Sequence, residues 1–183
     1  MPEPSNIARI THNLGLATWF GGALFGQVAL NPTISRISDR RERGRVLNES
    51  WGRFNAVTFA SIAASILTWR LGGLREDAEL RAPALTRIKN LLLGGAVING
   101  IASGILGARI AKEAPGEAPE GGTPVEAGTQ PAPETPEEAA QAQRLISITG
   151  PSALSLLATV IALSAIIDSS AVKPRGILSR LFL

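Results

Sequence analysis

Four long apolar runs, separated by polar segments, dominate the chain. Each run lacks Asp, Glu, Lys and Arg, and each has a basic residue close to one or both ends. A helix of about 20 apolar residues crosses the hydrocarbon core of a bilayer, whereas a helix buried in a soluble bundle carries a polar stripe. The pattern predicts an all-α fold, an integral membrane four-helix bundle forming a single domain over residues 1–183. We expect its spans near residues 10–31, 52–72, 87–111 and 144–168.

The segments between the runs differ in kind. The first run ends at Asn31-Pro32, a pair that predicts a helix stop. Residues 113–136 form a tract of Pro, Gly, Glu and Ala between the third and fourth helices, with almost no large apolar side chain. Such a composition cannot bury a core, so we predict a disordered Pro/Gly/Glu-rich loop there.

The basic residues set the expected orientation. They cluster at the ends of the apolar runs, which favours a membrane surface over nucleic acid as the partner. The first span has one basic residue before it, Arg9, and six between it and the second apolar run, including those of "RRERGR" at 40–45. The predominance of Arg over Lys, 15 to 3, is typical of a bacterial chain. We therefore expect a bacterial inner (plasma) membrane protein with both termini outside and residues 40–45 in the cytoplasm.

Small residues recur on one face of each predicted span. In the first span they are Gly15, Gly22 and Gly26, and in the third they are Gly100 and Gly104. Small side chains let two helix backbones approach closely in a bilayer. We expect these five glycines to be helix-packing positions, either within one chain or between two copies.

Composition restricts the chemistry. The chain has no Cys and a single His, and its one Met is the first residue, so thiol nucleophiles and thiolate metal sites are excluded. His12 lies at the boundary of the first span, where we expect an interfacial polar residue. Haem usually takes two axial ligands, and only a homodimer could supply a second His12. Trp51 and Trp69 bracket the second span as an interfacial aromatic pair would.

Polar side chains inside the spans are the remaining candidates. Asn99 is near the centre of the third span, and Asn55 is near the start of the second. Buried polar groups in lipid hold helices together or line a path. The apolar runs contain no ionisable residue, which argues against a proton-coupled transporter.

Two resemblances follow from short motifs. "WFGGALFGQVALNPTISRI" followed by "RGRVLNESWGRFN" resembles a four-helix membrane domain of unknown function shared by bacterial proteins and the transmembrane-protein-205-like proteins of eukaryotes. That resemblance implies no established catalytic residues. His12, Trp19, Gly21 and Gly22 are also similar to a motif of HemJ-type and copper-resistance membrane domains, but the other histidine of those proteins has no counterpart here.

These observations predict a multi-pass membrane protein that is not an enzyme and acts through helix packing with itself or a membrane partner in the bilayer. No metal and no cofactor are expected. Two alternatives stay open at this point. One is a haem- or quinone-linked redox protein that uses His12. The other is a small oligomeric transporter or channel lined by Asn55, Asn99 and the Ser and Thr residues of the fourth run.

Overall fold

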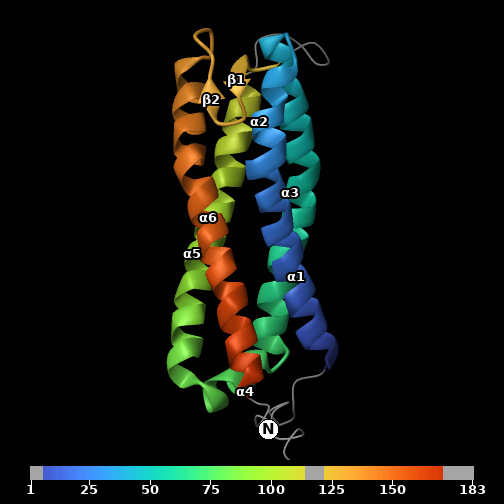
Figure 1. Ribbon diagram of the computed structural model, residues 1–183, viewed down its shortest axis with the longest axis vertical. Helices are drawn as coiled ribbons and strands as arrows, with labels where there is room; N and C mark the ends of the chain where they lie inside the picture. Colours follow the sequence, from blue (N-terminus) through green and yellow to red (C-terminus); the bar gives the residue numbers. More distant parts are fainter. Residues whose placement is uncertain (1–5, 114–121, 171–183) are drawn as a thin grey trace, which may run out of the picture.

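The computed structural model describes residues 6–113 and 122–170, which are mostly helical (Figure 1). Long helices run along the molecule, with a short β-hairpin at one end and the short helix α4 at the other. These ends are called the hairpin end and the α4 end. The elements are α1 (Asn6–Phe25), the π-helix η1 (Gly26–Leu30), α2 (Asn31–Thr33), the 3-10 helix η2 (Ile34–Arg36), α3 (Arg40–Leu71), α4 (Leu74–Arg81), α5 (Pro83–Lys112), β1 (Val125–Ala127), β2 (Gln130–Pro131) and α6 (Glu137–Ser169).

Local signals in the sequence set several helix ends. The Asp39 side chain accepts the backbone N–H of Glu42 at 2.7 Å and so caps α3. Between α3 and α4, Gly73 has a φ of 73°, in the left-handed region that favours glycine. Pro83 is at the start of α5. A proline is tolerated there because the N–H groups of the first helical turn make no hydrogen bond within the helix.

Three helices, α3, α5 and α6, are long and apolar enough to cross a membrane by length and composition. Large apolar side chains also point outward from the bundle, such as Leu91 and Ile98 on α5 and Ile148 on α6. A bilayer solvates such a surface, whereas water does not. These features support the prediction of a helical, multi-pass membrane protein.

The predicted helix stop at Asn31-Pro32 is wrong. From Asn6 to Arg36 the chain is helical without a break, and Pro32 lies inside this run. Just before the proline the backbone widens into the π-helix η1, where the N–H of Asn31 bonds to the carbonyl of Gly26. In a regular α-helix the ring of a proline clashes with the carbonyl group four residues earlier. The wider turn of a π-helix leaves room for the ring.

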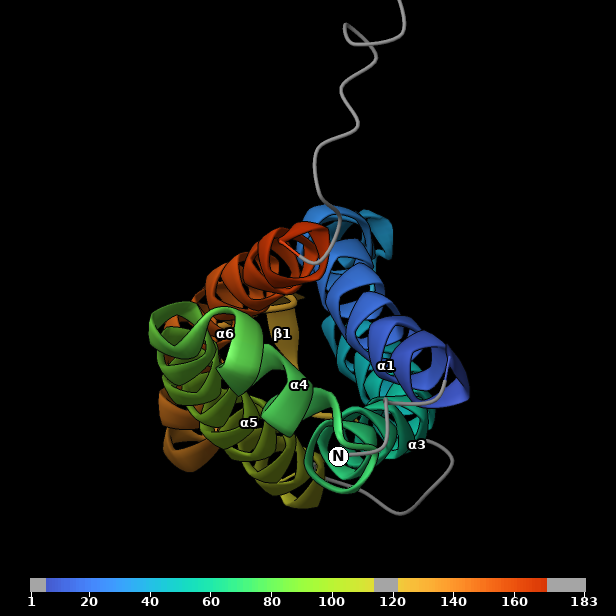
Figure 2. The same ribbon diagram turned by 90° about the horizontal axis from the view of Figure 1, so that it is seen from below.

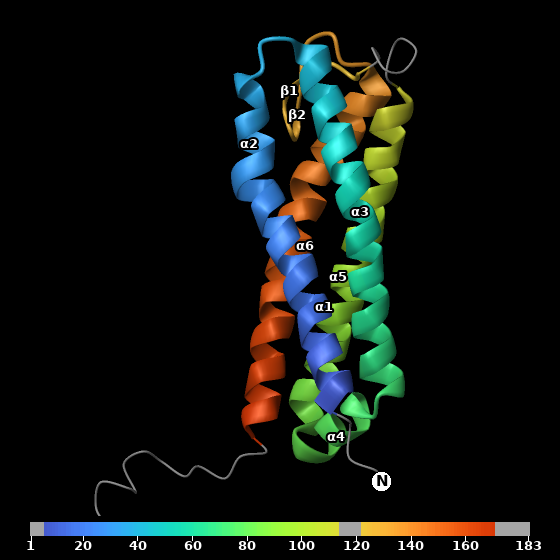
Figure 3. The same cartoon turned by 90° about the vertical axis from the view of Figure 1, so that its right-hand side faces the viewer.

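The prediction of disorder is wrong for residues 122–136, while residues 114–121 lie outside the described part of the chain. Here β1 and β2 pair antiparallel and sit on the hairpin end of the bundle (Figure 3). Thr123 and Val125 are almost completely buried. Composition failed as a guide because this segment is ordered mainly by backbone contacts and hydrogen bonds rather than by large apolar side chains.

The N-terminal turns of α3 hold the hairpin in place. Gly44 lies so close to the backbone of Thr123 that a Cβ atom would overlap it. The guanidinium of Arg43 donates to the backbone carbonyl of Glu126 at 2.9 Å, and Arg40 pairs with the Glu126 carboxylate, also at 2.9 Å. Two of the arginines in the segment 40–45, which the sequence analysis used only to predict orientation, therefore bind the hairpin.

The long helices form two closely packed pairs, α1 with α3 and α5 with α6, arranged around a common axis (Figure 2). At the α4 end both pairs share one apolar core, which includes Leu16, Trp19, Ile62, Leu93 and Leu157. At the hairpin end there are instead two separate clusters. One, with Leu106 and Ala142, lies between α5 and α6, and the other, with Leu47 and Val125, lies under the hairpin. The space between the pairs is thus left unfilled at the hairpin end.

Each of the five candidate packing glycines lies against a side chain from another helix of the same chain. The pairs are Gly15 with Ser65, Gly22 with Phe54, Gly26 with Trp51, Gly100 with Trp19 and Gly104 with Phe59. Four of the five partners are aromatic rings, which need the room that a missing Cβ leaves. These glycine faces are therefore used inside the chain.

The docking of the hairpin can be tested with two alanine substitutions on α3. Gly44→Ala places a methyl group against the Thr123 backbone, which cannot move aside as a side-chain tip can. Overpacking of this kind costs about 1–3 kcal/mol, so the hairpin amides of Gly128 and Ala132 should exchange with deuterium at least about fivefold faster. Gly52→Ala is the control, because nothing lies within 4 Å of its Cβ position. Equal exchange in both variants would contradict the docking.

Candidate functional site

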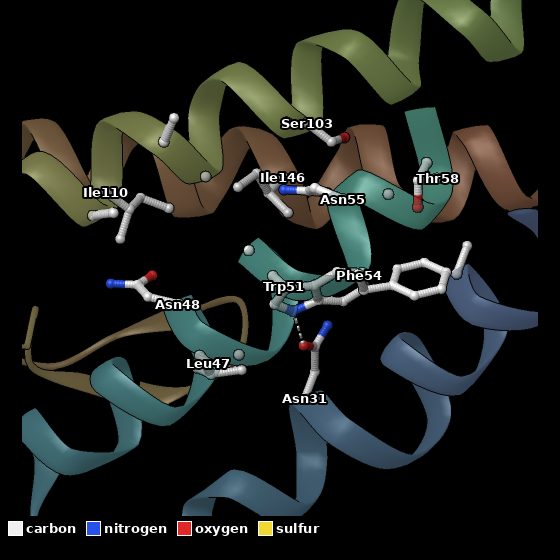
Figure 4. A pocket seen from close by; sticks show the side chains of 18 of the residues that line it. Asn31, Leu47, Asn48, Trp51, Phe54, Asn55, Thr58, Ser103, Ile110 and Ile146 are labelled. Carbon is white, nitrogen blue, oxygen red and sulfur yellow. Dashed lines mark hydrogen bonds between the residues drawn. The ribbon is translucent and has the colours of Figure 1, made fainter. Parts of the chain in front are cut away.

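A cavity of about 270 Å³ occupies the space between the two helix pairs at the hairpin end (Figure 4). Along α3 its wall extends from Gly44 to Thr58, a rise of about 21 Å at 1.5 Å per residue. The hairpin contributes Val125 and Gly128 at one end, and Trp19 lies at the other. None of the described residues that line the cavity is charged, and none is a histidine.

The lining combines polar and apolar side chains. Polar groups come from Gln27, Asn31, Asn48, Asn55, Thr58, Ser103 and Gln143. Between them lie the apolar surfaces of Trp51, Phe54, Ile110 and Ile146. In Figure 4 the amides of Asn48 and Asn55 lie in the space between the helices, facing α5 and α6. Such a mixed, largely preformed wall is typical of sites for small molecules.

Asn31 fixes one side of this wall. Its Oδ1 atom accepts a hydrogen bond from Trp51 Nε1 at 3.2 Å, and its backbone carbonyl accepts the N–H of Gly128 at 3.1 Å. One residue thus joins the end of the first helical run, α3 and the hairpin. It follows directly on the π-helix η1, an irregularity that is often found at functional sites.

Two buried polar atoms of the lining, Oε1 of Gln143 and Oγ1 of Thr58, have no hydrogen-bond partner among the described residues. Gln143 is only 1% exposed. Thr58 differs from Thr68 and Thr86, whose hydroxyls donate to the carbonyl four residues earlier. An unsatisfied buried polar group costs about 1–3 kcal/mol, so a hydrogen-bonding partner at either atom would stabilise the structure.

At the α4 end His12 is buried inside the bundle, with 2% of its surface exposed, so its side chain does not face the headgroups, while its place at the membrane boundary stays a prediction. Its Nδ1 lies 2.9 Å from the carbonyl of Ser65, and its Nε2 lies 3.1 Å from Nζ of Lys89. A carbonyl only accepts, so Nδ1 carries the hydrogen and Nε2 accepts from the lysine. The ring also stacks on Trp69, with 5.3 Å between centroids, and Nζ of Lys89 lies 3.4 Å from the centroid of the Trp69 ring.

The two tryptophans that bracket the second expected span both pack against neighbouring helices. Trp69 is buried and donates to Oδ1 of Asn90 at 2.8 Å. Trp51 lies over Gly26 and donates to Asn31. Both indoles face inward because small residues or hydrogen-bond acceptors on neighbouring helices lie beside them. These contacts cannot be predicted from the position of a tryptophan relative to the apolar run.

The surroundings of His12 leave little room for a ligand. Arg9 pairs with both Asp168 and Asp77, and together with His12 and Lys89 these residues enclose a space of about 10 Å³. That is enough for about one water molecule. Within the described ranges, no three His, Asp or Glu side chains lie together as a metal site would require.

Only some of the residues singled out from the sequence meet at one place. Asn55, Gly100 and Gly104 line the cavity. Asn99 does not, and its amide donates instead to the carbonyl of Gly95 on its own helix at 2.9 Å. His12 lies at the opposite end of the bundle.

Sequence reasoning missed Gln143, Thr58 and Lys89. Gln143 precedes the fourth apolar run and Lys89 precedes the third, so both counted as flanking residues. The signal that could have placed Lys89 is Pro83, which starts α5 six residues earlier and so puts Lys89 well inside the helix. Nothing local to Gln143 reveals the cavity.

The pairing of His12 with Lys89 predicts strong coupling between them. His12→Leu leaves the buried amino group of Lys89 without its acceptor, and we expect a loss of about 1–3 kcal/mol in the free energy of unfolding. Lys89→Met should cost about 1–3 kcal/mol. Because the double variant leaves neither group unpaired, it should be at least about 1 kcal/mol more stable than the sum of the two effects predicts. Unfolding in detergent micelles measures all three, and additive effects would contradict the pairing.

No known protein family, no curated protein and no solved structure matches this chain. Membership of the transmembrane-protein-205-like family thus stays a prediction from the quoted motifs. What the protein does must be inferred from its own residues.

Proposed function

We propose that this chain is a four-span, non-catalytic membrane protein that binds a small uncharged molecule in the cavity between its helix pairs. In this proposal the helical run from Asn6 to Arg36 is the fourth span, beside α3, α5 and α6. The observation that carries the binding function is a cavity that is polar yet uncharged and contains unpartnered buried atoms.

The chemistry of the wall favours a neutral ligand with both apolar and polar parts. A charged ligand would lose its hydration and find no opposite charge among the lining residues. A purely apolar ligand would leave Gln143 and Thr58 without partners. The cavity volume of about 270 Å³ is close to the lower end of the range for small-molecule sites, about 300 Å³.

A catalytic role is less well supported by the same lining. General acid–base and nucleophilic catalysis need a titratable group or an activated nucleophile. The lining provides amides and hydroxyls, and the hydroxyl of Ser103 is bonded to Thr149 at 2.9 Å rather than to a base. Binding without chemistry is therefore the simpler function for this wall.

The two alternatives from the sequence receive less support. A haem-linked function through His12 would require displacement of Lys89 from Nε2 and much more space than the 10 Å³ beside the ring. A transport path would have to pass Trp19, which is buried against Gly100 above the shared core. Helix packing with a second chain would need faces other than the five glycine contacts, which are used within the chain.

Binding can be measured by quenching of tryptophan fluorescence, since Trp19 and Trp51 line the cavity. The probe is 8-bromo-1-octanol, added to the full chain in lipid nanodiscs, with 8-bromooctanoate as the charged counterpart. We expect saturable quenching by the alcohol, and only linear, lipid-phase quenching by the carboxylate.

A pair of substitutions on α6 localises the site. Ala153→Leu fills the cavity from a buried lining position and should remove the saturable component. Ala158→Leu, on an exposed face of the same helix, should leave it unchanged. Saturable quenching that survives Ala153→Leu, or none in the parent protein, would refute the proposal.

We further propose that the hairpin end faces the cytoplasm of a bacterial inner membrane. Residues 40–45 place four arginines at this end. The first span has one basic residue before it and six between it and the second apolar run, an asymmetry that favours the hairpin end as the cytoplasmic side under the positive-inside rule.

Orientation is tested by single cysteines, since the chain contains none of its own. A membrane-impermeant maleimide should label Glu76→Cys, at the exposed surface of α4, in intact spheroplasts. Arg41→Cys should react only after permeabilisation. The reverse pattern would invert the proposed topology.

A further inference from the structure

We propose that the cavity recognises a hydroxyl group, so that its ligand belongs to the class of uncharged alcohols or phenols with an extended apolar body. The inference rests on the proposed function and adds the chemical class of the ligand to it. It also assigns Gln143 as the residue that binds the hydroxyl.

Gln143 is the strongest indication. Gln143 lines the cavity, and its buried Oε1 atom accepts no hydrogen bond within the described part of the chain. In this orientation of the amide the oxygen requires a donor, which ethers, esters, ketones and quinones lack. A hydroxyl both donates and accepts, and therefore suits the side-chain amide in either of its two orientations.

The shape of the cavity places the two parts of the ligand. Gln143 lies in the second turn of α6, which begins at the hairpin end with Glu137. From there the wall continues past Trp51 and Phe54 towards Trp19, an increasingly aromatic surface deeper in the bundle. A ligand with its hydroxyl at Gln143 and its apolar body extending towards Trp19 would fit this arrangement of polar and aromatic lining. The same orientation is that of an amphiphile in the surrounding bilayer, with its polar end near the interface.

Water alone is a poor occupant of the whole cavity. A water molecule could pair with Gln143, but a buried water needs two to four polar partners. Trp51, Phe54, Ile110 and Ile146 offer none along their faces. An apolar chain that displaces water from these side chains gains the hydrophobic contribution of its buried area.

The test compares two isomers, 1-octanol and 1-methoxyheptane, as competitors of 8-bromo-1-octanol in the nanodisc quenching assay. Concentrations are expressed as mole fractions in the lipid phase, which removes the difference in partitioning. One hydrogen bond predicts that the alcohol competes about three- to tenfold better than the ether in the parent protein. Equal competition by the two isomers would overturn the inference without any substitution.

Matched substitutions identify the residue. Gln143→Met removes the amide at nearly constant volume and should lower the affinity of the alcohol to that of the ether, which is itself unchanged. Gln141→Met is the control, because Gln141 is exposed and bonds to Glu137. Thr58→Val tests the opposite end of the cavity. A loss of alcohol affinity in Thr58→Val alone would overturn the assignment to Gln143.

The outcomes separate the two levels of the proposal. If both isomers compete equally and Ala153→Leu abolishes the binding of both, the cavity binds small uncharged molecules but does not distinguish a hydroxyl from an ether. If neither isomer competes and the brominated probe shows no saturable quenching, the proposed binding function itself fails.

Discussion

The contact between Trp19 and Gly100 is the constraint on which the interior of this protein depends. The indole of α1 reaches across to α5, where a Cβ on the glycine would lie 2.9 Å from its ring. On the α4 side of this contact the two helix pairs share one apolar core, and on the hairpin side they do not. The tryptophan is thus both the end of the core and the floor of the cavity.

The two halves treat buried polar groups in opposite ways. At the α4 end His12, Lys89, Trp69 and Asn90 are joined by hydrogen bonds and ring contacts. Removal of one partner from such a buried hydrogen-bonded cluster leaves the others unsatisfied, so the cluster ties α1, α3 and α5 together. At the hairpin end some lining groups are paired, as Asn31 is with Trp51 and Ser103 with Thr149, but the buried Oε1 of Gln143 and Oγ1 of Thr58 have no partner among the described residues. The hydrogen-bonded groups at the α4 end stabilise the fold. In our proposal the unpartnered groups at the hairpin end bind a ligand.

The β-hairpin completes the cavity by an unusual route. Its sequence has little to bury, yet it is held by the arginines of α3, by the backbone contact of Gly44 and by the carbonyl of Asn31. The same asparagine holds Trp51 in the wall. Asn31 therefore couples two features of the cavity. Its backbone holds the hairpin that closes one end, and its side chain positions Trp51 in the wall.

Sequence by itself determined the helices and their membrane character, because apolar runs of spanning length and local caps such as Asp39 and Pro83 act over short distances along the chain. It also located the small-residue faces, since spacing along a helix fixes which residues share a side. It did not place His12, Trp51 or Trp69 inside, did not order residues 122–136, and gave no sign of Gln143. Those depend on contacts between distant parts of the chain. His12 and Lys89 are 77 residues apart, and Gly44 of α3 meets Thr123 in the segment before β1. Only the packing of the helix pairs decides which polar groups find partners and which are left facing a cavity, because burial and hydrogen bonding are properties of neighbours in space.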